Sequence, residues 1–221
     1  MTIADSIIKN ILKNVYFIWG RGKTTIANRL KEQYGFYVYS TDESRERQMR
    51  SANPIDQPYM CRNFQKEYGV KSFWELPAEV IAEREKHFVE EMTPMMIAEL
   101  IALSSIHKII LCEGDIDYRA VAPLATHTVH LCNQSTSFDW FNRPDHEDVR
   151  NILRGRTDLS AEEKQLIINN AYNAVSSNDI TLPDWVIELG IKNIVWNDRT
   201  SIDMTAAQVA TYFGFNQQMR E

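Results

Sequence analysis

The chain has 221 residues and a formal net charge of −6, with 44% hydrophobic and 24% charged residues. This length and composition are typical of a globular protein with one substantial core, and the negative charge argues against nucleic acid as a partner. No run approaches the roughly 18 apolar residues that span a bilayer, and the three cysteines show no disulfide pattern. We therefore expect a cytoplasmic protein that works without a membrane.

Five short apolar runs, rich in β-branched and aromatic residues, punctuate the chain. They cover residues 15–19, 36–39, 109–112, 129–132 and 194–196. Their apolar character is continuous rather than alternating, which indicates strands buried on both faces, as in a parallel sheet.

Helical periodicity separates these runs. It is found at 24–34, at 78–104 and at 206–213, and Pro94 is expected to kink or divide the second segment. Strands that alternate with helices predict βαβ units. The predicted fold is therefore α/β, with a doubly wound, mostly parallel five-stranded sheet and helices on both faces.

We expect a single domain over residues 1–221. Two stretches interrupt the strand–helix alternation with additional helical pattern, at 43–77 and at 135–178. They are interpreted as helical insertions into that domain.

The most specific motif follows the first apolar run, where a glycine turn leads into the start of a helix. It comprises Gly20, Arg21, Gly22, Lys23, Thr24 and Thr25. At such a helix start, backbone N–H groups surround a phosphate, a lysine ammonium bridges terminal phosphates and a threonine hydroxyl holds Mg²⁺. A chance Gly-Lys-Thr in a turn is the alternative, but the preceding strand and following helix favour a phosphate site.

By this motif and its setting, the chain resembles the P-loop small-molecule kinases, a group that includes nucleoside monophosphate, shikimate and gluconate kinases. The resemblance implies the P-loop NTPase fold, with ATP and Mg²⁺ as cofactors. The implied activity is ATP-dependent phosphorylation of a small metabolite or nucleotide. Lys23 would then be catalytic, Thr24 would hold the metal, and residues 20–25 would bind the nucleotide.

The motif departs from the family pattern in its length. Four residues separate the two glycines in that pattern, whereas only Arg21 separates Gly20 from Gly22, so the loop is about three residues short. Either the loop is truly shortened and cannot encircle a β-phosphate, or residues are absent from this sequence. A shortened loop favours a rival function, a non-catalytic ligand-binding or regulatory protein on the same fold.

Asp42 follows the second apolar run. In the kinases that the chain resembles, an acidic residue here faces the acceptor hydroxyl, so Asp42 is the candidate to orient or deprotonate it. Arg45 is a candidate to bind an anionic acceptor. The segment 43–77 is accordingly interpreted as a helical insertion on the acceptor side. The alternatives are a helix cap for Asp42 and a solvated basic helix face for Arg45.

Glu113 ends the third apolar run, and Asp115 lies in the loop that follows. An acidic residue at the end of a strand beside a P-loop is the Walker B arrangement, which holds Mg²⁺. We assign Glu113 to the metal with Thr24, and both Glu113 and Asp115 to the substrate. The alternative is that Glu113 and Asp115 are simple turn residues without a role in binding.

Several arginines lie in the second insertion. The segment 135–178 resembles a kinase lid in placement and composition, and arginines on a lid neutralise the transferring phosphoryl group. Arg154 and Arg156 are the candidates for this catalytic role, followed by Arg150, and Arg143 lies in the same segment. The alternative is a set of surface arginines paired with nearby acids, which contribute little free energy.

Overall fold

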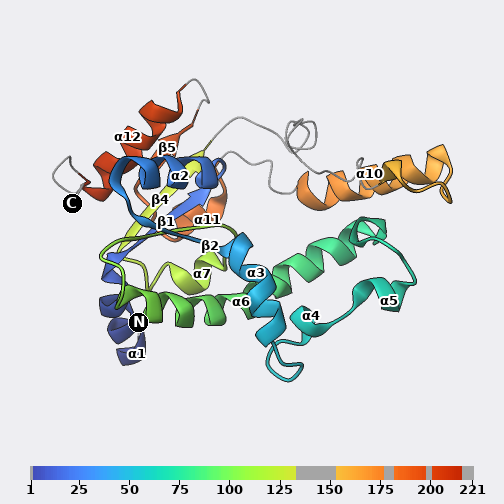
Figure 1. The fold of residues 1–221 in the computed structure, drawn as a ribbon, viewed down its shortest axis with the longest axis horizontal. Coiled ribbons are helices and arrows are strands. Elements are labelled where there is room, and N and C mark those ends of the chain that lie inside the picture. The colour runs from blue at the N-terminus through green and yellow to red at the C-terminus, as the bar shows by residue number, and fades with distance from the viewer. Residues whose placement is uncertain (1, 133–152, 177–181, 198–200, 216–221) are drawn as a thin grey trace. The chain divides into compact units, whose positions relative to one another are not determined.

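The structure is a computed structural model that describes residues 2–132, 153–176, 182–197 and 201–215 (Figure 1). The strands are β1 (Val15–Gly20), β2 (Tyr37–Ser40), β3 (Ile110–Glu113), β4 (His127–Cys132) and β5 (Ile194–Trp196). The first helices are α1 (Ile3–Ile11), η1 (Leu12–Asn14), α2 (Lys23–Tyr34), α3 (Thr41–Ser51), α4 (Pro58–Cys61) and α5 (Phe64–Tyr68). They are followed by η2 (Phe73–Glu75), α6 (Ala78–Ser104), α7 (Tyr118–Val121), α10 (Ala161–Ser176), α11 (Asp184–Glu188) and α12 (Ile202–Phe213).

The five strands form one sheet in the order β2-β3-β1-β4-β5, and all the strand pairs are parallel. This confirms the predicted α/β fold with a doubly wound parallel sheet. The register brings Ile18 of β1 and Ser40 of β2 level with Glu113 of β3. Because the strands are parallel, the segments that leave β1, β2 and β3 start from the same edge of the sheet.

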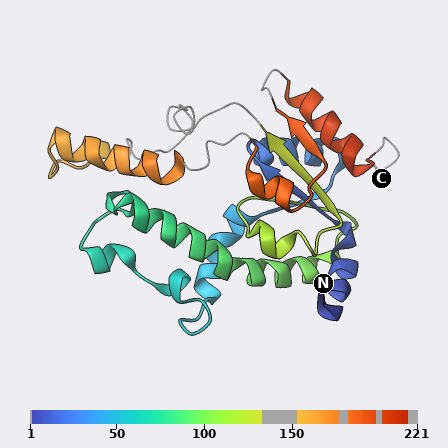
Figure 2. The same cartoon turned by 180° about the vertical axis from the view of Figure 1, so that it is seen from behind.

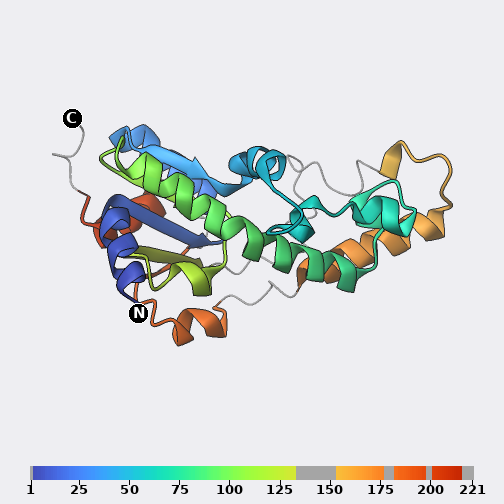
Figure 3. The same cartoon turned by 90° about the horizontal axis from the view of Figure 1, so that it is seen from below.

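Helices cover both faces of the sheet, and each face has its own core. Ile18 packs with Ile26 of α2 and Val209 of α12 on one face. Phe17, the preceding residue, packs on the other face with residues of α6, α7 and α11. Helices α7 and α11 are seen best in Figure 2, and α6 is seen best in Figure 3. Successive side chains of a strand point to opposite faces, so the continuous apolar runs follow from burial on both sides.

The structure contradicts one of the two outcomes expected at Pro94, a division of the second helical segment at 78–104. Helix α6 runs unbroken from Ala78 to Ser104 with Pro94 inside it. Met92 and Met96 are buried on either side of the proline, and the Thr93 hydroxyl donates to the carbonyl of Val89 at 2.7 Å. Packing on both sides therefore outweighs the loss of one backbone hydrogen bond.

The residues fall into two compact units. The first combines residues 1–52, 89–133 and 182–221 and contains the whole sheet, and the second combines residues 53–88 and 134–181. In the second unit, Leu153, Ile167 and Ala171 form a small core against Trp74. Within the described ranges, no helix combines the length and hydropathy that crossing a bilayer requires.

Candidate active site

The loop between β1 and α2 is a tight turn built on two glycines with positive φ, 88° at Gly20 and 85° at Gly22. Between them, the N–H of Arg21 donates to the carbonyl of Leu131 on β4 at 3.1 Å. One backbone donor of the short loop is therefore directed to the sheet rather than to a ligand. The first N–H groups of α2, which begins at Lys23, have no carbonyl partner within the helix.

Gly20, the last residue of β1, lies so close to the neighbouring strand β4 that a side chain does not fit. A Cβ there would lie 2.1 Å from the carbonyl oxygen of Leu131, whereas a Cβ at Gly35, also at positive φ, would meet no atom within 4 Å. We expect Gly20→Ala to lower the free energy of unfolding by about 3 kcal/mol, from backbone strain plus overpacking. Gly35→Ala, the matched control, should cost about 1 kcal/mol. Urea unfolding measures both, and equal losses would contradict the close approach.

Lys23 contacts the loop after β3. Its Nζ lies 3.3 Å from Oδ1 of Asp115, and the Asp115 side chain is 63% exposed. Burial alone would lower the pKa of Lys23, but the charge of Asp115, with Tyr118 and Asp42, raises it above its ordinary value. The ammonium is thus cationic at neutral pH. Because a solvent-exposed ion pair contributes little free energy, a ligand phosphate can replace Asp115 as its partner.

Thr24 contacts the end of β3. Its hydroxyl donates to Oε2 of Glu113 at 2.7 Å, and the Glu113 side chain is buried. Oε1 of Glu113 is buried without a hydrogen-bond partner within the described part of the chain. A buried carboxylate oxygen of this kind needs a donor or a cation, and Mg²⁺ takes oxygen ligands and retains several waters. Thr24 and Glu113 therefore fit a Mg²⁺ ion that keeps part of its hydration shell. No group of three metal-ligating side chains occurs among the described residues.

Asp42 lies in the first turn of α3, whose N-cap is Ser40. Asp42 is therefore not the capping residue, which the sequence had left as the alternative. Although its side chain retains solvent exposure, partial burial raises the pKa of Asp42 above its ordinary value, as does the charge of Asp115, and Lys23 partly offsets this rise. A carboxylate whose pKa lies closer to neutrality is a better proton acceptor.

The acceptor side is fixed by close packing between the ends of β2 and β3. A Cβ on Gly114 would lie 1.9 Å from Oγ1 of Thr41, so only glycine fits there. The hydroxyl of Tyr39 donates to Oε2 of Glu99 on α6 at 2.5 Å, and Arg47 of α3 forms two hydrogen bonds with the same carboxylate. These contacts hold the start of α3, and with it Asp42, against the sheet.

The remaining predicted residues divide between the two units. Arg45 is close enough to Asp42 to lower its pKa, so it belongs to the same cluster. Arg154 and Arg156 belong to the second unit, where Glu75 and Asp158 bind the Arg156 guanidinium. Arg143 and Arg150 lie outside the described residues. The structure thus gathers Lys23, Thr24, Asp42, Glu113 and Asp115 at one edge of the sheet, and gives Arg156 carboxylate partners in its own unit.

Sequence reasoning missed Tyr118. Its phenol interacts electrostatically with Lys23, Asp42 and Asp115. An aromatic residue soon after a buried strand resembles a core residue, so the sequence offers no signal for this placement.

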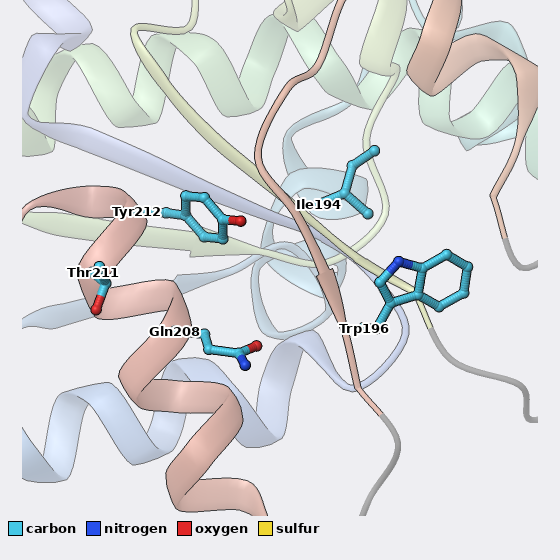
Figure 4. A pocket seen from close by; sticks show the side chains of 5 residues that line it. All are labelled: Ile194, Trp196, Gln208, Thr211 and Tyr212. Carbon is cyan, nitrogen blue, oxygen red and sulfur yellow. The ribbon is translucent and has the colours of Figure 1, made fainter.

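A separate hollow of about 510 Å³ is lined by residues of β5 and α12 (Figure 4). It is lined by Ile194, Trp196, Gln208, Thr211 and Tyr212. None of the predicted catalytic residues belongs to it.

No protein-family model matches the chain, and a search of curated proteins finds no match. Among solved structures, dephospho-CoA kinase from Campylobacter jejuni is similar over 94% of this chain and 98% of its own, with 12% identity and a TM-score of 0.41. An unliganded sugar kinase from Janibacter sp. HTCC2649 is similar over 95% of this chain and 99% of its own, with 11% identity and a TM-score of 0.40. Likenesses this weak identify neither an activity nor a substrate, so function has to be inferred from the site.

Proposed function

We propose that the protein is a phosphotransferase of the P-loop kinase type, which transfers a phosphoryl group from ATP to a small-molecule acceptor with Mg²⁺. The observation that carries this proposal is the pair of contacts from the start of α2. Lys23 meets Asp115 at 3.3 Å, and Thr24 meets Glu113 at 2.7 Å. A cation, a hydroxyl and two carboxylates at the carboxyl edge of a parallel sheet are what binding a phosphate with Mg²⁺ requires.

Each residue has a distinct role in this proposal. Thr24 and Glu113 hold Mg²⁺, which neutralises charge on the transferring group when bound. Lys23 exchanges Asp115 for a phosphate oxygen, and Asp42 orients the acceptor hydroxyl and accepts its proton. Arg45, beside Asp42, binds an anionic group of the acceptor. Arg154 and Arg156 stay candidates for charge neutralisation, and Arg156 would first have to leave Glu75 and Asp158.

The test is thermal stabilisation by Mg·ATP. At about ten times the dissociation constant, a ligand selective for the native state adds about 1.4 kcal/mol, or roughly 3–6 °C in Tm for a chain of this size. Lys23→Ala should remove most of that shift, because it deletes the cation that faces the phosphate. Lys31→Ala, in the exposed last turn of the same helix, is the matched control and should retain it. A shift that persists in Lys23→Ala removes Lys23 from the site.

A second candidate function is a non-catalytic ligand-binding or regulatory protein on the same fold. It is favoured by the hydrogen bond from Arg21 N to Leu131 O, which takes a backbone donor away from the phosphate loop. This candidate predicts stabilisation by Mg·ATP or phosphate without release of ADP over a panel of hydroxyl-bearing metabolites. Release of ADP that depends on both Asp42 and an acceptor excludes it.

A further inference from the structure

The Tyr118 side chain is held rigidly beside the phosphate loop. Its ring stacks on Trp185 with centroids 4.2 Å apart and planes at 10°, and lies 5.3 Å from the ring of Trp19, the residue before Gly20. Asp117 caps α7 at its start, and the Asp117 N–H donates to Oγ1 of Thr93 on α6 at 3.0 Å. Stacking and backbone contacts together therefore fix where the phenol lies.

The Tyr118 hydroxyl is available as a hydrogen-bond donor. It makes no hydrogen bond to any residue that the structure describes, although it interacts electrostatically with Lys23, Asp42 and Asp115. Burial, reinforced by Asp115, raises the pKa of Tyr118 well above its ordinary value, so the phenol stays protonated. A fixed, protonated hydroxyl among these charged groups is suited to donate to an oxyanion that joins them.

The phosphate loop is short of such donors. A single residue separates its glycines, and the N–H of that residue is bonded to Leu131. We propose that Tyr118 supplies the missing donor: its hydroxyl binds an oxygen of the phosphate group that Lys23 holds. This inference rests on the proposed function, because it needs a phosphate at Lys23. It adds a ligand-binding residue that lies on α7 rather than in the loop.

Orthophosphate is the probe, because it needs no knowledge of the acceptor. Its dissociation constant would be measured by calorimetry for wild type, Tyr118→Phe, Tyr16→Phe and Lys23→Ala. Tyr118→Phe removes only the hydroxyl and keeps the ring stack, so we expect affinity to fall about tenfold or more, the usual effect of losing a hydrogen bond to a charged group. Tyr16→Phe removes a hydroxyl near the opposite end of β1 and should leave affinity unchanged.

The outcomes separate the two proposals. If Lys23→Ala abolishes binding and Tyr118→Phe does not weaken it, the inference on Tyr118 fails and the phosphate site stands. If wild type does not bind orthophosphate, or Lys23→Ala binds it equally well, both fail. Unchanged Tm and near-ultraviolet circular dichroism in Tyr118→Phe show that the stack with Trp19 and Trp185 is intact. If weaker phosphate binding in Tyr118→Phe comes with a lower Tm and a changed spectrum, the role of Tyr118 is purely structural and the inference is overturned.

A parallel titration with Mg·ATP identifies the source of the phosphate. Equal weakening of both ligands in Tyr118→Phe assigns the contact to a nucleotide phosphate. Weakening of orthophosphate alone assigns it to the phosphate of another ligand. Both results support Tyr118 as the donor.

Discussion

Replacing Asp42 by asparagine should lower the turnover of phosphoryl transfer by roughly two to four orders of magnitude, the usual contribution of a general base. Asparagine keeps the size of the side chain but cannot accept the proton of the acceptor hydroxyl. Turnover would be measured as ADP release with an acceptor identified by screening hydroxyl-bearing metabolites. Mg·ATP should still raise the Tm of the variant, because Lys23, Thr24 and Glu113 are unchanged.

The same variant should be at least as stable as wild type at pH 7. The folded pKa of Asp42 is raised, so its protonated form favours the folded state, and this contribution is lost as the pH rises through the folded pKa. Asparagine removes the charge, so any gain in stability should appear at pH 7 and vanish below the unfolded pKa of about 3.9. Chemical denaturation at pH 7 and pH 3 measures it. Near-normal turnover in Asp42→Asn would move the base to Glu113 or Asp115.

The sheet and the clustering of the candidate site residues were predictable because both depend on local patterns. Strands such as 109–112 are apolar throughout since both faces are buried, and the observed strand β3 differs from the predicted run by one residue at each end. Parallel strands share a carboxyl edge, so the polar residues that follow β1, β2 and β3 had to meet. Lys23, Asp42 and Asp115 therefore form one cluster.

Features that depend on packing between distant segments could not be predicted. Considered without its tertiary contacts, Pro94 predicts a break in the helix. The buried methionines on either side of it explain why the helix is continuous. Tyr118 is placed by Trp19 and Trp185, which lie far from it in sequence. One of the two carboxylates that bind Arg156 comes from Glu75, which lies far from it in sequence.

The short loop itself gives the last prediction. With one residue between Gly20 and Gly22, few N–H groups converge on a phosphate, so ATP should bind more weakly than millimolar, with no more than about 4 kcal/mol of binding free energy. Tight binding of ATP by the native chain would refute this expectation.

Inserting three small residues after Arg21 restores the family spacing and should tighten Mg·ATP binding at least about a hundredfold, or about 2.7 kcal/mol, because added backbone N–H groups can surround the β-phosphate. The same insertion after Gly69, where a Cβ would meet no atom within 4 Å, is the control and should leave affinity unchanged. Calorimetry measures the affinity, and cooperative unfolding shows that each variant folds. If the lengthened loop folds and binds no better, loop length does not limit nucleotide binding, and the Arg21–Leu131 hydrogen bond is not evidence for a lost phosphate cradle.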